Sequence, residues 1–540
     1  MSREKQKIVA FVTAVLWMSA GPVAAQTKVA APRPVRGIIL MPQVKQTVPK
    51  TAPVVTPAPQ AKEAAPKPAP RVTPVPQSTR AGPIGTPAVT PVPQAKEVVT
   101  SAARDGYVIP EAKLDNGVQI EDPSGQWGLR LTARFQADYR KFSADAALVD
   151  TFAIRRARLG IGFNLPNRVS VFTEGEFAFG SGGGGTAQNA NLQQGYVEYA
   201  PYAATKVRLG QFKPQYSLEN MTSPWHLDFM ERAFHAQLLQ NFAYDRGVMV
   251  HGTPFMGAYY GMSFMNGTAN NTDELQRTAA DASADNKDLI FRLAANAAPW
   301  IENAESVIHV GGDWRTANVA NATGSATSNG YLAPSFITEA RGLTFFAPEE
   351  FNSLAPLMSD EITRTIMGGE FALAWREFKF QTEHHVANYQ VKENATGTTF
   401  SRDIKAGYLS ANWLVTGESF SDAYVNGAFG RIRPKQNFGS GGWGAVQMGL
   451  RYSYVDASDF SNSNPINTGR PASSSGPNPK VTSLTNKATA ITLGLKWMPD
   501  PYAAIFLNVI QTNFDTPVAV NGMNVGRERA LTLRAALEFF

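Results

Sequence analysis

The sequence predicts an all-β fold, a transmembrane antiparallel β-barrel of about 16 strands. From Asp105 to Phe540, apolar and polar residues alternate over sixteen segments, and alternation of this kind is typical of strands, whose successive side chains point to opposite faces. Most segments have roughly 10–15 residues, whereas soluble strands have about 5–6 and tilted membrane-spanning strands need about 9–11. Short connections also alternate with long ones, as in outer-membrane barrels.

The composition excludes several classes of protein. The chain has 540 residues, no cysteine and 17% charged residues. The lack of cysteine excludes disulfide scaffolds, thiolate metal sites and cysteine nucleophiles. Mean hydropathy is −0.21, and no run of about 18 or more apolar residues occurs, so a helical membrane protein is not expected.

Residues 1–25 have the pattern of a secretory signal peptide. Arg3, Lys5 and Lys7 precede the short apolar run "IVAFVTAVLW". Val23 and Ala25 are small residues before a cleavage point that we expect after Ala25. The segment therefore predicts export.

Residues 26–104 are rich in Pro, Ala, Val and Lys and contain a degenerate repeat, "VTPAPQAKEA", "VTPVPQ" and "VTPVPQAKEV". Such a composition cannot bury a core and favours extended polyproline II. We therefore expect a disordered periplasmic linker that contacts peptidoglycan or an envelope partner. The segment has 11 Lys and Arg against 2 acids, while residues 105–540 have 36 Lys and Arg against 41 Asp and Glu. The net charge of +6 therefore belongs to the leader and linker, and no nucleic-acid partner or cofactor is predicted.

Residues 105–540 are expected to form the barrel. The predicted strands are 126–142, 150–167, 168–180, 191–201, 205–213, 246–254, 257–267, 287–299, 305–317, 365–377, 378–391, 402–417, 442–458, 487–500, 501–514 and 528–540. Short connections lie at 164–167, 200–205, 252–257 and 498–501, and long ones at 214–245, 268–287, 317–363 and 457–485. The segment 416–440 is an exception, because it is long but falls on the side of the short turns.

The stretch "DTFAIRRARLGIGFNLPN", 150–167, indicates which face meets water. One face carries Ala157, Leu159, Ile161 and Phe163, and the other carries Ile154, Arg156, Arg158, Gly160 and Gly162. An arginine that faces lipid at the membrane midplane costs about 2–4 kcal/mol. The arginine face is therefore expected to line a water-filled lumen. Arg155 has the opposite parity but lies near the extracellular end of its strand, so we expect it at the rim, as part of the anion path.

Several motifs make the chain resemble the phosphate-selective porin O and P family over roughly residues 110–540. They are "FAIRRARLGIGF" (152–163), "VRLGQFKPQYSLENMTS" (207–223), "FMERAF" (229–234) and "RGVMVHG" (246–252). The resemblance implies a homotrimer of sixteen-stranded barrels in outer-membrane lipid, passing phosphate-like anions. It also implies that 214–245, 317–363 and 416–440 fold into the lumen.

Parity and the resemblance together predict an anion path. Parity places these bases inside: Arg156, Arg158, Arg208, Arg292, Arg315, Arg451, Lys496 and Arg534. Lys213 and Arg232 flank the expected constriction, and "GRIRPKQ" supplies Arg431, Arg433 and Lys435. Arginine offers a permanently charged fork of donors to an oxyanion, and a ladder of moderate sites lets an ion enter and leave. The predicted function is passive uptake of small anions, phosphate or polyphosphate, through this lumen.

Other functions stay open at this point. The bases could instead pair with Glu174, Glu176, Glu198, Asp313 and Glu370, which parity also places inside; this would make a general or differently selective porin. No enzyme is predicted, and an outer-membrane hydrolase or a secreted β-rich binding protein are minor alternatives. "GSGGGG" at 180–185 lacks the lysine of a phosphate-binding loop. His384 and His385 fall on opposite faces of a strand and cannot share a metal ion, so no metal site is predicted.

Overall fold

The computed structural model describes residues 111–113, 118–122, 126–143, 148–178, 191–240, 244–266, 287–320, 335–346, 359–393, 399–460, 485–520 and 522–539. The predicted signal peptide, the predicted linker and the glycine run at 180–185 lie outside these residues. Among the described residues, no helix combines the length and the apolar character needed to cross a bilayer.

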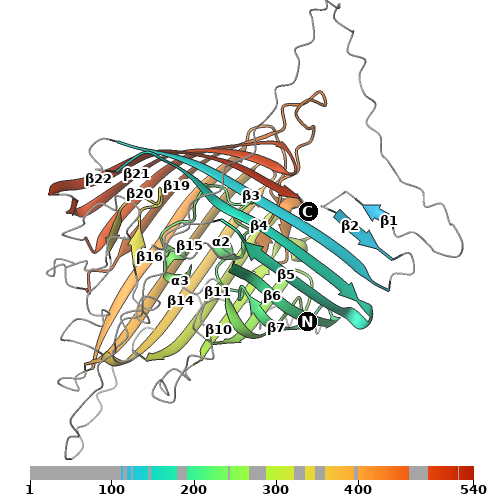
Figure 1. The fold of residues 1–540 in the computed structure, drawn as a ribbon, viewed down its shortest axis with the longest axis horizontal. Coiled ribbons are helices and arrows are strands. Elements are labelled where there is room, and N and C mark those ends of the chain that lie inside the picture. The colour runs from blue at the N-terminus through green and yellow to red at the C-terminus, as the bar shows by residue number, and fades with distance from the viewer. Residues whose placement is uncertain are drawn as a thin grey trace, which may run out of the picture. The chain divides into compact units, whose positions relative to one another are not determined.

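Strands dominate the described chain (Figure 1). They are β1 (Glu111–Lys113), β2 (Val118–Glu121), β3 (Gly128–Phe142), β4 (Thr151–Leu165), β5 (Val169–Glu176), β6 (Asn191–Tyr202), β7 (Thr205–Phe212), β8 (Asp245–Gly252), β9 (Ala258–Met265), β10 (Asp288–Asn296), β11 (Ser306–Ala320), β12 (Phe336–Ile337), β13 (Thr344–Phe346), β14 (Ser359–Trp375), β15 (Phe378–Glu393), β16 (Thr399–Leu414), β17 (Tyr424–Val425), β18 (Ala428–Phe429), β19 (Ala445–Asp456), β20 (Lys487–Asp500), β21 (Ala503–Val520) and β22 (Met523–Phe539). The helices are α2 (Leu218–Met221), α3 (His235–Gln240) and the 3₁₀ turns η2 (Pro166–Arg168), η5 (Ala298–Ile301) and η8 (Ser421–Ala423).

Sixteen antiparallel strands close into a barrel, which confirms the predicted fold. Every strand from β3 to β22 pairs with its neighbour in chain order, except that the short pairs β12–β13 and β17–β18 form separate sheets. The barrel closes where Ala530 of β22 lies opposite Phe142 of β3 and Phe539 opposite Ala133. Beyond that point β2 pairs with the first residues of β3, so the β1–β2 hairpin extends the sheet past the C-terminus.

The two faces of the barrel differ as the alternation predicts. In β22 the exposed apolar residues are Leu531, Leu533, Leu537 and Phe539, and the buried polar residues between them are Thr532, Arg534 and Glu538. A band of apolar side chains that faces outward suits lipid, because water is absent there.

The connections between strands alternate in length as predicted, except that the one between β21 and β22 is shorter than expected. At the end of the barrel that carries the C-terminus (the C-terminal end), the turns are short except for residues 415–444. At the opposite end β21 and β22 run further than predicted, to Val520 and from Met523, and a bulge lies between Asn513 and Val518. The reason is the Asn-Gly pair at 521–522, which favours a two-residue hairpin turn and in which Gly522 has φ 81°.

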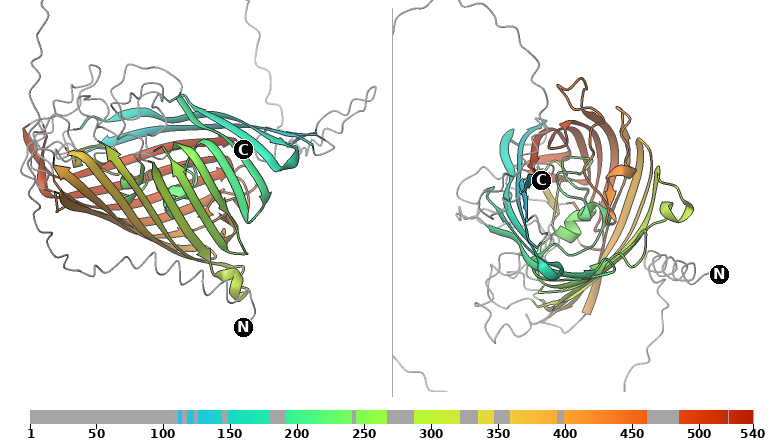
Figure 2. Two further views of the ribbon diagram at one scale, coloured as in Figure 1. Left: turned by 90° about the horizontal axis from the view of Figure 1, so that it is seen from below. Right: turned by 90° about the vertical axis from the view of Figure 1, so that its right-hand side faces the viewer.

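Three connections enter the barrel, as the family resemblance implied (Figure 2). They are residues 213–240 with α2 and α3 (here called the inward segment), residues 335–346 with β12 and β13, and residues 415–444 with β17 and β18. Phe234 of the inward segment packs against Phe345 at 5.6 Å between ring centroids, and Phe345 packs against Phe514 of β21 at 5.5 Å. These apolar contacts fix the segments to one side of the barrel.

Candidate functional site

Four basic side chains of the barrel wall donate hydrogen bonds to backbone carbonyl oxygens of the inward segment. The pairs are Lys496 Nζ with Leu227 (3.0 Å), Arg451 Nη1 with Glu231 (2.9 Å), Arg315 Nη1 with Leu239 (3.3 Å) and Arg534 Nη1 with Met230. A charged donor makes a stronger hydrogen bond than a neutral one. These bases therefore hold the segment in place.

Four of the predicted path residues are sealed and paired with buried acids. The pairs are Arg292 with Glu370 (2.8 Å), Arg315 with Asp288 (2.7 Å), Arg451 with Glu339 (2.7 Å) and Arg534 with Asp138 (2.7 Å). Each of these arginines is at most 1% exposed. A passing ion does not reach a guanidinium group that is covered in this way, so these four arginines hold segments together.

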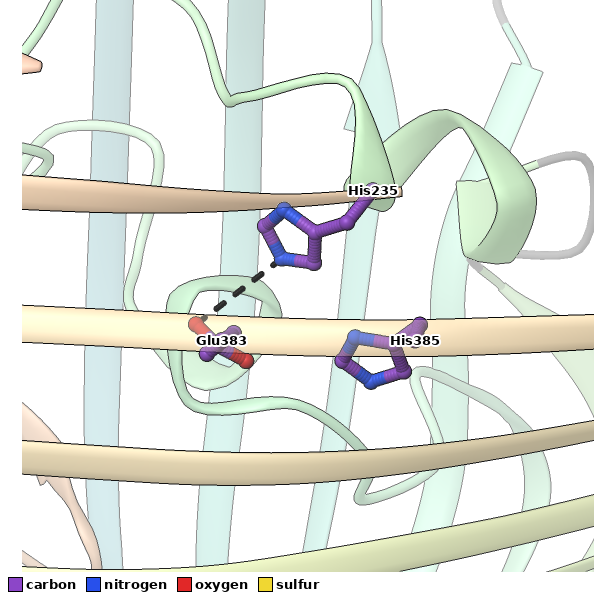
Figure 3. Close-up of side chains that lie close together, drawn as sticks. All are labelled: His235, Glu383 and His385. Atoms are coloured by element: carbon purple, nitrogen blue, oxygen red, sulfur yellow. Dashed lines mark ion pairs between the residues drawn. The ribbon is translucent and has the colours of Figure 1, made fainter. Parts of the chain in front are cut away.

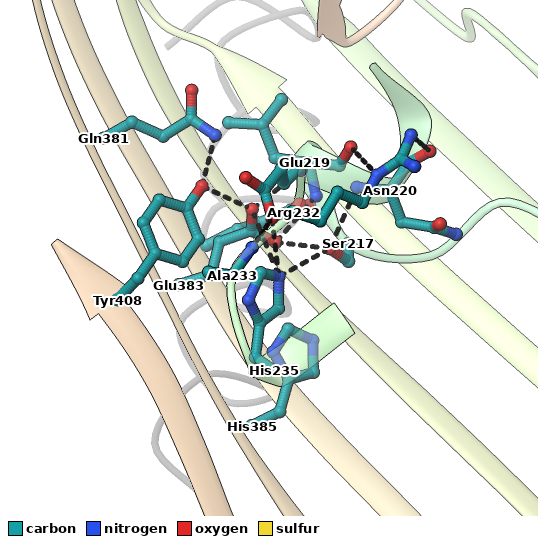
Figure 4. Close-up of polar contacts among 12 residues, drawn as sticks. Ser217, Glu219, Asn220, Arg232, Ala233, His235, Gln381, Glu383, His385 and Tyr408 are labelled. Atoms are coloured by element: carbon teal, nitrogen blue, oxygen red, sulfur yellow. Dashed lines mark hydrogen bonds and ion pairs between the residues drawn. The ribbon is translucent and has the colours of Figure 1, made fainter. Parts of the chain in front are cut away.

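A carboxylate of the wall organises the start of α2. Glu383 of β15 accepts hydrogen bonds from Ser217 Oγ at 2.6 Å and from the backbone nitrogens of Leu218 and Glu219 at 2.9 and 2.7 Å (Figure 4). These donors would otherwise be unsatisfied at the first turn of a helix. The contact fixes the inward segment to the wall opposite β3 and β4.

A β-bulge in β4 places two neighbouring arginines inside the barrel. Gln136 of β3 lies opposite Arg156, and the next pair of the register involves Ile154, so Arg155 is an extra residue. Arg155 Nε binds Glu231 at 2.8 Å, and Arg156 Nη1 binds Gln136 at 2.6 Å. An extra residue reverses the alternation, and Ile154 is accordingly 44% exposed. The predicted inward position of Ile154 was wrong, because alternation alone does not reveal a bulge. The same bulge turns Arg155, which parity had placed on the outer face, toward the interior.

Trp225 of the inward segment faces three of these bases. The guanidinium carbons of Arg134, Arg158 and Arg156 lie 5.0, 5.5 and 6.0 Å from its ring centroid. Cations are attracted to the face of an indole ring. Trp225 therefore helps to hold several positive charges close together.

The lumen surface formed by β3 and β4 (the β3–β4 side) carries more bases than acids. Seven arginines (Arg134, Arg140, Arg155, Arg156, Arg158, Arg431 and Arg534) face five acids (Asp138, Glu174, Glu176, Glu231 and Glu538), and four of these acids are each shared by two arginines. The shared acids are Glu174 with Arg134 (2.8 Å) and Arg158 (3.5 Å), Glu231 with Arg155 (2.8 Å) and Arg534 (2.6 Å), Glu538 with Arg134 (3.2 Å) and Arg431 (2.9 Å), and Asp138 with Arg140 (2.5 Å) and Arg534 (2.7 Å). The side chains of Arg134, Arg155 and Arg431 are 16%, 12% and 12% exposed. Water therefore reaches this side of the lumen.

Lys213 and Arg232 add positive charge to the same region. Lys213 donates to the carbonyl of Asn220, and Arg232 donates to the carbonyls of Glu219 at 3.0 Å and Thr222 at 2.6 Å. Burial first, and then the charges of Arg232 and two β4 arginines, hold the pKa of Lys213 well below its usual value. The structure thus brings Lys213, Arg232, Arg156 and Arg158 together.

The remaining predicted bases lie apart. Arg431 lines a pocket at the C-terminal end together with His226 and Lys496, and both Arg431 and His226 bind Glu538. Arg433 and Lys435 are exposed in the same turn. Arg208 is paired with Glu198 at 2.5 Å and lies over the Tyr196 ring.

The prediction missed Arg134, Arg140, Arg341 and Trp225. Arg134 and Arg140 share the parity of Asp138 on β3, so the rule of alternation that found Arg156 would have found them. Arg341 and Trp225 lie in inward connections, where no periodic pattern indicates a direction.

A closed antiparallel barrel with an apolar outer face and a charged interior narrowed by an inward loop is the architecture of an outer-membrane porin. The chain belongs to the phosphate-selective porin O and P family, whose model matches residues 129–539. This confirms the resemblance, and it places the protein in the outer membrane.

Relatives are distant. An uncharacterized protein of Caulobacter vibrioides is 24% identical over 355 residues, which are 62% of this chain and 63% of that protein. Porin O of Pseudomonas aeruginosa is 23% identical over 367 residues, 64% of this chain and 77% of that protein. Among solved structures, an anion-selective porin from Comamonas acidovorans is 13% identical, covers 77% of this chain and all of its own, and has a TM-score of 0.43.

Proposed function

We propose that the barrel is a channel for passive uptake of small anions, with phosphate and polyphosphate as its preferred ions. The observation that carries the proposal is the excess of arginines over acids along the β3–β4 side, where the side chains of Arg134, Arg155 and Arg431 reach water. A guanidinium fork matches the oxygens of a phosphate group. The description of the family as phosphate-selective supports the same substrate. Family and fold favour a channel over an enzyme.

The proposed path runs along β3 and β4 from one end of the barrel to the other. It begins at Arg140 and Arg155 and continues past Arg156 and Arg158, where Lys213 and Arg232 face them. It ends at Arg134 and Arg431 near the C-terminal end, while Lys496 beside them holds the inward segment. Several moderate sites in a row allow an ion to leave as well as to enter.

A general diffusion porin is the second candidate. All five acids that parity placed inside do contact bases: Glu174 and Glu176 contact Arg158, Glu198 contacts Arg208, Glu370 contacts Arg292, and Asp313 contacts His385. Pairing of this kind weakens any net preference. The two candidates differ in the charge that remains on the β3–β4 side.

A reversal-potential measurement distinguishes them. The full chain is inserted into a planar bilayer under a KCl gradient, and the sign of the zero-current voltage is recorded. For an anion channel, the zero-current voltage has the sign expected for chloride flow down its gradient. Added phosphate should then reduce the chloride current, because it competes for the arginines. A reversal potential near zero, or one set by potassium, would support the general porin.

We also propose that the chain is a homotrimer and that residues 26–104 lie in the periplasm, where they contact peptidoglycan or an envelope partner. Family membership supports the trimer, and the basic, proline-rich composition supports the contact. Cross-linking in intact outer membranes tests both, because a trimer gives a band at three times the monomer mass and a bound linker is recovered with peptidoglycan.

A further inference from the structure

Two histidines and a glutamate meet where the inward segment touches the barrel wall. His235 comes from α3, and Glu383 and His385 come from β15 (Figure 3). All three are buried, and one nitrogen or oxygen atom of each lies within 4.8 Å of those of the other two. The contact joins an internal connection to a strand about 150 residues away in sequence.

The two imidazole rings have nitrogen atoms without partners. Nε2 of His385 is hydrogen-bonded to Asp313 Oδ2 at 3.0 Å, which makes Nε2 the protonated nitrogen and leaves a lone pair on Nδ1. That Nδ1 is buried and has no hydrogen-bond partner, and the same is true of Nδ1 of His235. Histidines that bind metal ions commonly donate their other ring N–H to a carboxylate in this way. His385 therefore has the surroundings of a metal ligand, with Asp313 as its orienting group.

Two carboxylates approach the same point. Glu219 Oε2 and Glu383 Oε1 each lie 3.8 Å from Nε2 of His235, so Nε2, and not the unpartnered Nδ1, is the nitrogen of His235 that would bind an ion here. Ser217 Oγ lies 3.4 Å from the same Nε2. Together with Asp313 they place three acids beside two histidines. Two ionised carboxylates would balance the charge of a divalent cation, and a buried charge needs such a partner.

Four hydrogen bonds orient the carboxylate of Glu383, and one of them can be replaced by a bond to an ion. Its three hydrogen bonds from residues 217–219 fix its direction, as hydrogen bonds to a ligating carboxylate commonly do. The fourth comes from the hydroxyl of Tyr408 to Oε1 at 2.8 Å. The oxygen of this hydroxyl also accepts a hydrogen bond from Gln381. The hydroxyl oxygen therefore stays hydrogen-bonded to Gln381 when an ion replaces the hydroxyl proton on Oε1 of Glu383.

We propose that His235, Glu383 and His385 bind a divalent transition-metal ion, with Glu219 as the fourth ligand, and that the ion fastens the inward segment to β15. Two imidazole nitrogens and two carboxylate oxygens suit Zn²⁺. A tetrahedral ion with bonds of about 2.0–2.1 Å holds its ligands roughly 3.3 Å apart, so the side chains close in by about 1 Å on binding. The site lies on the wall across from the β3–β4 side and does not depend on anion selectivity.

Metal content is the first test. The full chain, purified in detergent without a histidine tag, is incubated with Zn²⁺ alone, freed of loose ion by gel filtration, and assayed for zinc by mass spectrometry. One zinc ion per chain is expected. His235→Gln and His385→Gln should each lose it. His384→Gln is the matched control, because His384 is the neighbouring residue in β15 and is exposed on the outer face; it should keep the ion.

Two further measurements test the metal site even if a histidine variant folds poorly. Cobalt(II) bound to the wild-type chain should give the visible absorption of a tetrahedral complex. Asp313→Asn should keep the fold, shown by heat-modifiable mobility, but weaken zinc binding by about 10–100-fold, since Asp313 orients His385. The proposal is overturned if wild-type chain retains no zinc, if its cobalt spectrum is that of the aqueous ion, or if His384→Gln loses the metal as completely as His385→Gln.

Discussion

Arg155 of β4 and Glu231 of the inward segment form an ion pair of 2.8 Å inside the barrel. The pair exists because the bulge in β4 turns Arg155 inward. Burial raises the pKa of Glu231, but the charges of Arg155 and Arg534 outweigh this effect and hold the pKa well below its usual value. Glu231 therefore stays ionised in mildly acidic medium and keeps both arginines in position around the channel.

Arg156→Glu should shift the permeability ratio toward cations. Arg156 is bound to the neutral side chain of Gln136, so the change reverses one charge without removing an acid's partner. The shift should be largest near 0.01 M salt, where the Debye length is about 30 Å, and small at 1 M, where it is about 3 Å. Reversal potentials at the two salt concentrations measure it. An unchanged ratio at low salt would place the ion path elsewhere.

Arg158→Glu is the matched comparison from the same face of β4. Arg158 contacts Glu176 at 2.6 Å and Glu174 at 3.5 Å, so the variant would bring three carboxylates together. Breaking a buried pair in this way costs about 3–5 kcal/mol. The folded fraction, read from heat-modifiable mobility, should fall for Arg158→Glu and stay near wild type for Arg156→Glu.

Anion preference should fall as the pH rises, at a pH below the range in which an ordinary lysine loses its proton. The pKa of Lys213 lies well below its usual value because of burial and the nearby arginines. Its proton is therefore lost at lower pH than that of an ordinary lysine, and one positive charge leaves the constriction. Reversal potentials recorded over a pH series that ends below the usual lysine pKa of about 10.4 measure the change. Lys213→Met should remove most of this dependence, and a variant with the same pH profile as wild type would assign the titration to another group.

Lys496→Met should loosen the inward segment. Lys496 is buried, and its ammonium group binds the carbonyl of Leu227. A hydrogen bond to a charged group contributes about 1.5–3 kcal/mol, so openings of the segment should become roughly tenfold more frequent or more. Single-channel recordings at 1 M salt, where charge effects are screened, should show larger or noisier conductance. Lys487→Met is the control, because Lys487 is exposed at the opposite end of β20; equal effects of both changes would argue against a role in anchoring.

The sequence predicted the strands well and the interior only in part. Alternation is a property of the strand itself, so it placed Arg315, Arg451 and Arg534 inside without any knowledge of the fold. It did not show that these arginines bind the carbonyls of Leu239, Glu231 and Met230, because such contacts join parts of the chain that are far apart in sequence.

The histidine cluster shows the same limit. His384 and His385 do lie on opposite faces of β15, as predicted, since one is exposed and the other buried. The prediction stopped there because alternation relates residues of one strand. His235 lies in α3 of an inward connection, and only the folded chain brings it to His385.

Deleting residues 26–100 while keeping residues 1–25 should leave single-channel conductance unchanged. The barrel closes on itself through β22 and β3, and these residues precede its first strand. Planar-bilayer recordings of the shortened chain test this. The same variant should be released from peptidoglycan more readily than wild type, and a much altered conductance would show that the linker reaches into the pore.

Leu159→Arg should damage membrane insertion and leave the lumen unaltered. Leu159 lies near the middle of β4, is 60% exposed on the outer face, and has Arg158 as its inward neighbour. An arginine on the lipid face costs about 2–4 kcal/mol at the bilayer midplane, so the folded fraction in lipid vesicles should drop markedly, as shown by heat-modifiable mobility. The channels that do insert should keep wild-type reversal potentials, because every lumen charge is retained.

Leu165→Arg is the control, because Leu165 ends the same strand and is also exposed, and the penalty falls to about 0–1 kcal/mol near the interface. Equal insertion of the two variants would mean that the outer face of β4 does not meet lipid at mid-strand.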